Sequence, residues 1–243
     1  MVYTFDHDLE FLGELDDDHL AVLVEILTKD TDGELRITEK LTTNKKYEAY
    51  YPKHSKYWKE IAEEIQLFGG NTFVNFFRGS GVQYKEILCD VCSKMKVNYN
   101  KSASTQQIEK YLLDKILKES LDAMTEEERK EFVKNLDLKT TGFTSQAIML
   151  AVQSGIKLGG FLSYQIAVIV ANIVAKALVG HGLSFAANAT LTRTIGFLVG
   201  PIGWIATGLW TAWDISGPAY RVTIPICIEI ACLRQIHAYE KNK

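Results

Sequence analysis

The chain has 243 residues, with 27 basic and 30 acidic side chains and a formal net charge of −3. This length allows one large domain or two small ones, and the near-neutral charge argues against a nucleic-acid partner because no overall cationic field attracts phosphates. Four cysteines are too few for a disulfide framework, and the first residues lack the basic start and apolar run of a secretion signal, so we expect a cytoplasmic protein or one at the inner face of a bacterial-type membrane.

The first 70 residues predict amphipathic helices. Apolar residues recur at helical spacing over 9–12 and again over 20–27, and the acids 16–18 suit the positive start of the second helix. A further stripe consists of Tyr57, Ile61, Ile65 and Phe68. The pair Gly69-Gly70 is typical of a C-terminal stop and predicts the end of that helix.

Residues 71–140 continue the helical pattern. Asn71 is a candidate cap for a short helix carrying Phe73, Phe76 and Phe77, and the next helix is lined by Tyr84, Leu88, Val91 and Met95. Thr105 is expected to cap a helix over 106–123. Thr125 and Glu128 have the spacing of a capping box, in which each side chain binds the other residue's free amide. No stretch alternates with period two for long, so this part is predicted to be all-α.

The charge is unevenly divided between two parts of the chain. Residues 1–140 carry a net charge of −7, whereas residues 141–243 carry +4 with only ten charged side chains. We therefore place a boundary at 140, between a charged soluble region (1–140) and an apolar, small-residue-rich region (141–243). The predicted fold is all-α, with the charged N-terminal helices packed on very apolar C-terminal helices.

Two uncharged runs in the second part approach the length of a membrane span. They cover residues 158–175 and 194–213, and a bilayer core needs roughly 20 apolar residues. Gln165, Asn172 and the Gly200-Pro201 pair weaken both runs as lipid-facing helices. We favour a buried apolar core over an integral two-span hairpin.

Small residues repeat every fourth position through the same region. The row contains Gly155, Gly159, Ser163, Ala167, Ala171 and Ala175, and Gly196 and Gly200 repeat the spacing. Small residues at this spacing let a second helix approach closely, in a membrane or in a soluble core. We predict helix–helix contact along the row, with Ile166 and Ile169 on the opposite face.

The few charges near the chain end predict an ion pair. Asp214, Arg221 and Glu229 flank apolar helices, and an unpaired buried charge is costly. We expect at least one pair among the three, and the alternative is that Gly217-Pro218 places them at a hydrated helix junction.

No motif indicates catalysis, a cofactor or a metal. Cys89 and Cys92 form a CxxC in the middle of a predicted helix, where the helix N-terminus does not activate a thiol. Cys227 and Cys232 would complete a set of four thiolates, but the spacing between these two is not that of a usual zinc site. The histidines show no ligand spacing, and no phosphate loop or nucleophile elbow is present. We expect structural thiols and a protein that is not an enzyme.

One basic and aromatic stretch is a candidate interfacial patch. It consists of Lys45, Lys46, Tyr50, Tyr51, Lys53, Lys56, Tyr57 and Trp58. Lysines with amphipathic rings suit an anionic membrane interface and also single-stranded nucleic acid. The alternative is a solvated face neutralised by the acids over 6–18.

Several longer strings resemble a known family. They are Leu9-Glu10-Phe11-Leu12, Leu20-Ala21-Val22-Leu23, Phe68-Gly69-Gly70-Asn71, Arg78-Gly79-Ser80-Gly81, Tyr84-Lys85-Glu86-Ile87-Leu88, the stretch from Ser216 to Pro225, and Ile230-Ala231-Cys232-Leu233-Arg234. The chain resembles the YaaW-type family of uncharacterised bacterial proteins, which is distantly similar to assembly chaperones of ubiquinol–cytochrome c reductase. The resemblance implies a helical, non-enzymatic protein that handles a membrane partner, and it supplies no catalytic residues.

The sequence therefore supports two functional hypotheses. The first is a membrane-associated or chaperone-like interaction protein that binds a protein partner or a membrane surface, either alone or as a homo-oligomer. The second is a pore-forming or toxin-like effector in which a buried hairpin of 158–175 and 194–213 inserts into a bilayer.

Overall fold

The computed structural model describes residues 3–30, 33–36, 39–72, 81–158, 160–179 and 220–242. These residues form helices and their connections, and the extended structure among them is one isolated bridge between Lys29 and Leu35. The predicted all-α fold is confirmed for these residues. The helices, with 3₁₀ segments marked η, are η1 (Glu10–Glu14), α1 (Asp17–Thr28), α2 (Lys45–Tyr50), η2 (His54–Tyr57), α3 (Trp58–Thr72), α4 (Tyr84–Lys94), α5 (Thr105–Ala123), α6 (Glu126–Asn135), α7 (Ser145–Leu158), α8 (Gly160–Val179) and α10 (Tyr220–Lys241).

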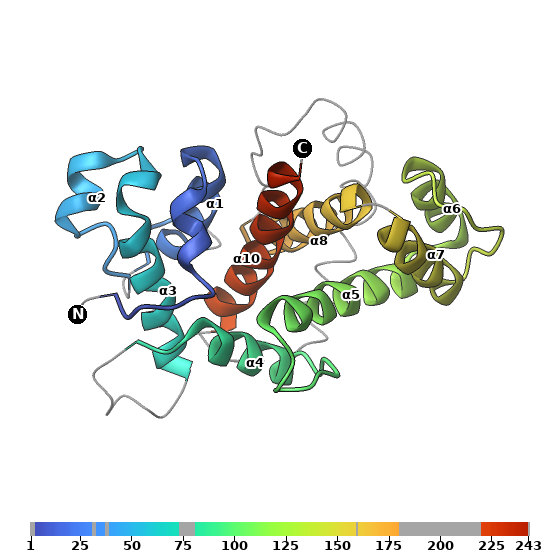
Figure 1. Cartoon of the computed structure of the whole chain (residues 1–243), viewed down its shortest axis with the longest axis horizontal. Helices are drawn as coiled ribbons and strands as arrows, with labels where there is room; N and C mark the ends of the chain where they lie inside the picture. Colours follow the sequence, from blue (N-terminus) through green and yellow to red (C-terminus); the bar gives the residue numbers. More distant parts are fainter. Residues whose placement is uncertain are drawn as a thin grey trace.

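Helix α10 is the central element of the described fold. It contacts α1, α3, α4, α5 and α8, and it crosses the middle of the molecule in Figure 1. Every side chain from Val222 to Leu233 is buried, as expected for a helix that is apolar on all sides and surrounded by others. The charged N-terminal region therefore folds around this C-terminal helix.

Local capping sets several helix starts, and one of these caps, the capping box of α6, is the one that the sequence predicts. Asp16 accepts a hydrogen bond from the His19 amide at 2.9 Å and caps α1. The reciprocal capping box of Thr125 and Glu128 begins α6. At α5 the cap is Ser104 rather than Thr105, because the Thr105 side chain is buried and bonds elsewhere.

The expected stop of α3 at Gly69-Gly70 is wrong, because the helix continues to Thr72. A Cβ atom on Gly69 would overlap the side chain of Ile87 on α4. This glycine therefore allows α3 and α4 to approach closely and does not end the helix. The predicted short helix carrying Phe73, Phe76 and Phe77 lies outside the described residues.

The row of small residues runs along two helices rather than one. Helix α7 ends at Leu158 and α8 begins at Gly160, so no continuous rod carries the row. Ile166 and Ile169, expected on the face opposite the row, are 3% and 2% exposed. Both faces of α8 are buried here, so neither isoleucine can serve as an exposed control position.

Among the described helices, none combines the length and apolar character needed to cross a bilayer. The run 158–175 covers the end of α7 and most of α8, and α8 packs against α10. The run 194–213 lies outside the described residues. The boundary at 140 falls in the connection between α6 and α7, and its interpretation as a domain boundary stays a prediction.

Candidate functional site

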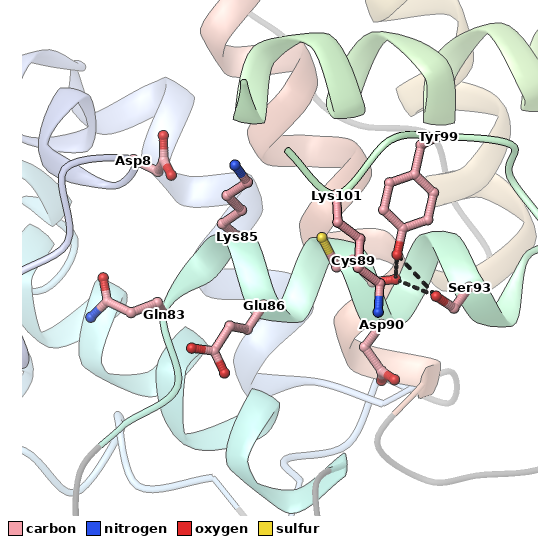
Figure 2. Close-up of a pocket in the computed structure, with 9 residues that line it drawn as sticks. All are labelled: Asp8, Gln83, Lys85, Glu86, Cys89, Asp90, Ser93, Tyr99 and Lys101. Carbon is pink, nitrogen blue, oxygen red and sulfur yellow. Dashed lines mark hydrogen bonds between the residues drawn. The ribbon is translucent and has the colours of Figure 1, made fainter. Parts of the chain in front are cut away.

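A cleft of about 610 Å³ lies on the exposed side of α4, between the N-terminal segment and the connection from α4 to α5. Figure 2 shows α4 as its floor. The lining residues are Asp8, Gln83, Lys85, Glu86, Cys89, Asp90, Ser93, Tyr99 and Lys101. Two lysines, three acids and one thiol thus face a single concave surface.

The floor of the cleft follows from the amphipathic pattern of α4. Residues 86, 89, 90 and 93 follow the helical spacing i, i+3, i+4, i+7 and share the outer face. The opposite face consists of Ile87, Leu88, Val91 and Cys92, all buried in the core. Burial of the apolar face against α5 and α10 therefore presents the polar face to the cleft.

The connection between α4 and α5 is bonded to the floor and forms one wall. The Tyr99 hydroxyl donates to the Cys89 carbonyl at 2.8 Å and lies 3.0 Å from the Ser93 hydroxyl (Figure 2). The Lys85 ammonium donates to the Ala103 carbonyl at 2.7 Å. Partial burial raises the pKa of Tyr99, so this hydroxyl stays protonated and acts as a donor.

A buried ion pair holds the other edge of the cleft in place. Arg234 of α10 donates from Nε to Glu109 Oε2 of α5 at 2.8 Å and from Nη2 to the Asp8 carbonyl at 2.6 Å. The Asp8 carboxylate accepts from the Thr105 hydroxyl at 2.6 Å. The guanidinium also lies 4.3 Å from the centre of the Phe11 ring. Three distant parts of the chain meet at this point.

Burial raises the pKa of carboxyl groups in and below the cleft. Burial raises the pKa of Glu109, and the charge of Arg234 opposes that rise. Partial burial raises the pKa of Asp90, and a hydrogen bond with Tyr220 opposes it. Within the described parts of the chain, no group of three His, Cys, Asp or Glu side chains is placed to hold a metal ion. The cleft therefore presents polar groups and side chains of both charges to a ligand.

The four cysteines are free thiols in different environments. The CxxC lies in the middle of α4, as the sequence indicates, with Cys89 half-buried in the cleft and Cys92 in the core. Burial raises the pKa of Cys92 to about 12 and that of the buried Cys227 and Cys232 well above the usual value. Three of the four thiols are therefore inert core residues at neutral pH.

The structure places part of the small-residue row at close helix contacts. A Cβ atom on Gly155 of α7 would overlap the Leu162 side chain of α8. Ser163 of α8 donates to Gln235 of α10 at 2.8 Å, and Ala167 and Ala171 are buried. Gly159, Gly196 and Gly200 and the side chain of Ala175 lie outside the described residues.

The charges near the chain end are only partly described. Arg221 is exposed, whereas Glu229 is 1% exposed and its Oε1 has no hydrogen-bond partner in the described residues. Burial raises the pKa of Glu229 to about 8. These two residues form no ion pair with each other where the chain is described. Asp214 lies outside that part, so a pair with it stays a prediction.

The basic and aromatic stretch is mostly exposed and lies away from the cleft. Lys45, Lys46, Tyr50, Tyr51, Lys53 and Lys56 are exposed. Tyr57 is 1% exposed and bonds to His54, and Trp58 is half-buried, so these two rings belong mainly to the fold. Lys46 pairs with Glu60 at 2.7 Å.

Sequence reasoning did not identify the cleft or the ion pair below it. The polar positions 86, 89, 90 and 93 on the predicted helix form a signal that could have marked its floor. No local signal joins Asp8, Glu109 and Arg234, because every pair among them is more than one hundred residues apart in the chain.

Comparisons with known proteins identify relatives over most of the chain. A family model described as ubiquinol-cytochrome C chaperone matches residues 53–227, and one described as a domain of unknown function (DUF3944) matches residues 3–37. A UPF0174 protein of Helicobacter pylori strain J99 is 54% identical over 96% of this chain and 93% of its own length. A second from that strain is 43% identical over 82% of this chain and 98% of its own. The UPF0174 protein YaaW of Escherichia coli K12 is 34% identical over 96% of each chain. No solved structure matches.

Proposed function

Since the chain belongs to the UPF0174 family of YaaW-type proteins, and since the ubiquinol-cytochrome C chaperone model matches it over 53–227, we propose that it is a non-enzymatic, chaperone-type protein. Its client is a protein partner that binds in the cleft on α4. The matched range contains α4, the connection after it and α5, and these elements form most of the cleft.

The observation that carries this proposal is the mixed charge of the cleft. Lys85 and Lys101 line it together with Glu86 and Asp90, and the Tyr99 hydroxyl oxygen adds an acceptor. Pockets for small apolar ligands are lined mainly by hydrophobic side chains, whereas this lining matches the alternating charges and amides of a polypeptide segment.

The attachment of the cleft walls also suits binding rather than turnover. Tyr99 and Lys85 bond the connecting segment to α4, and the buried Arg234–Glu109 pair fixes the N-terminal edge. A surface held in place before binding loses little conformational entropy when a partner docks. Cys89 is the one thiol in the lining, and we assign it no catalytic role.

No observation on the described residues favours the pore-forming alternative. Helix α8 packs against α10, and the second half of the postulated hairpin, 194–213, lies outside the described part.

A photo-crosslinking amino acid at Glu86 tests the proposal. Glu86 is exposed and lines the cleft, so irradiation of cells that carry the full chain should give a discrete adduct with one protein. Lys101→Glu should abolish that adduct because it reverses a charge in the same cleft.

The same crosslinker at Lys134, which is exposed on α6 outside the cleft, serves as the matched control and should give no such adduct. Equal adducts from both positions, or an adduct that survives Lys101→Glu unchanged, would show that the cleft does not bind the partner.

A further inference from the structure

Residues 45–56 form an exposed surface at one end of the molecule, which we call the α2 patch and define as Lys45, Lys46, Tyr50, Tyr51, Lys53 and Lys56. Helix α2 contains no buried residue, and the Tyr50 and Tyr51 side chains are 46% and 59% exposed. Figure 1 shows α2 at the opposite end of the long axis from α6. These two rings are therefore not part of the hydrophobic core and are accessible to a partner.

The α2 patch carries an excess of positive charge in a chain whose net charge is −3. Residues 44–59 contain five lysines and one acid, Glu48, and all six side chains are exposed. Lys46 is paired with Glu60. Lys45, Lys53 and Lys56 are exposed and have no ion-pair partner among the described residues.

The acids that could neutralise this surface are mostly bonded elsewhere. Their partners are the Tyr84 amide for Asp6, the Thr105 hydroxyl for Asp8, His7 for Glu10, and Lys241 for Glu14. Asp16 caps α1, and Asp17 accepts from the Ser55 amide at 2.8 Å. The fold thus directs four of the seven acids over 6–18 toward the N-terminal segment itself, α4, α5 and α10. Asp17 stays close enough to Lys53 for the two charges to interact, but lysines still outnumber acids on the patch.

We propose that the α2 patch binds the surface of an anionic phospholipid bilayer. The lysine ammonium groups would meet lipid phosphates, and the Tyr50 and Tyr51 rings would lie at headgroup depth, where amphipathic aromatic side chains are favoured. The centres of the Tyr47 and Tyr51 rings lie 5.1 Å apart, so Tyr47 packs against the exposed Tyr51 ring. The contact needs no membrane-spanning helix and does not depend on the cleft.

Co-sedimentation of the full chain with vesicles tests the proposal. Vesicles of phosphatidylcholine with about one-third phosphatidylglycerol should bind the protein at low salt, whereas pure phosphatidylcholine vesicles should not, and binding should weaken as salt rises. Each lysine near an anionic leaflet contributes about fivefold to the binding constant. The triple variant Lys45→Gln, Lys53→Gln, Lys56→Gln should therefore bind about one hundredfold more weakly.

A matched control separates the effect of the patch lysines on vesicle binding from the effect of the protein's net charge. Lys96, Lys134 and Lys139 are exposed and lie outside the α2 patch, on α6 and in the connections after α4 and α6. Their triple Gln variant loses the same charge and should bind within about threefold of the parent. Tyr50→Ser with Tyr51→Ser should weaken binding without changing its salt dependence. Equal losses in the two lysine triples, equal binding to neutral vesicles, or tighter binding to a single-stranded oligonucleotide than to anionic vesicles would overturn the proposal.

Discussion

Replacing Arg234 by Met should be one of the most damaging single changes in the described core. The substitution keeps most of the side-chain volume but leaves the Glu109 carboxylate, which is 1% exposed, without the ion pair at 2.8 Å. The cheapest response at pH 7 is to protonate Glu109, which costs about 3.4 kcal/mol when its unfolded pKa is 4.5. Loss of the hydrogen bond to the Asp8 carbonyl adds about 1 kcal/mol. We expect a destabilisation of about 3–5 kcal/mol.

The pH dependence of this loss has a defined sign. With Arg234 gone, the folded pKa of Glu109 rises further above its unfolded value, because burial then acts without the opposing cation. Such a group contributes stability below its unfolded pKa and loses it as pH rises toward the folded pKa. The difference between the variant and the parent should therefore shrink to about 1–2 kcal/mol at pH 5.

Urea unfolding followed by circular dichroism at pH 7 and pH 5 measures both effects. The double variant Arg234→Met, Glu109→Leu should recover much of the loss, because it removes the stranded carboxylate. Lys118→Met, which breaks an exposed pair with Asp122, should cost less than about 1 kcal/mol. A cost below about 1 kcal/mol for Arg234→Met at pH 7, or an equal cost at both pH values, would refute the reasoning.

Three further predictions rest on other parts of the fold. Glu229→Gln should become more stable relative to the parent as pH rises from 5 to 8. The pKa of this buried carboxyl is raised to about 8, so the folded parent opposes its ionisation and loses stability over that range, whereas the amide does not titrate. A pH-independent difference in urea midpoints would contradict this. Gly155→Leu should cost about 1–3 kcal/mol because α7 and α8 touch there, while Leu150→Ser, at a site 59% exposed on the same helix, should change thermal stability little. Replacing Cys89 and Cys92 together by Ala should leave metal content unchanged by mass spectrometry, and stoichiometric zinc in the parent would show that the thiols are ligands.

The local structure of the described chain could be predicted to a large extent from sequence. Apolar spacing identified α1, α3, α4 and α5, because a helix that packs by one face must repeat its apolar residues near every 3.6 positions. The capping box of Thr125 and Glu128 was also predicted, since both partners lie within one turn and need no tertiary contact. Such features are decided by residues close in the chain.

The errors arose where a distant residue decided the outcome. Gly69 resembles a helix stop, yet the approach of Ile87 from α4 gives it a packing role inside α3. Thr105 resembles a cap, yet its hydroxyl bonds to Asp8 and the neighbouring Ser104 caps α5. In both cases the residue has two physically acceptable roles, and a tertiary contact selects one.

The sequence by itself determined the all-α class, the registers of several helices, the central position of the CxxC in its helix and the excess of lysines over 45–59. Only the tertiary structure decided which of those lysines lack an ion-pair partner among the described residues, which α4 residues line a cleft, and that Arg234 meets Glu109 and Asp8. The physical reason is sequence separation: the ion pair joins residues 125 positions apart, and its geometry exists only after α5 and α10 have packed their apolar faces together.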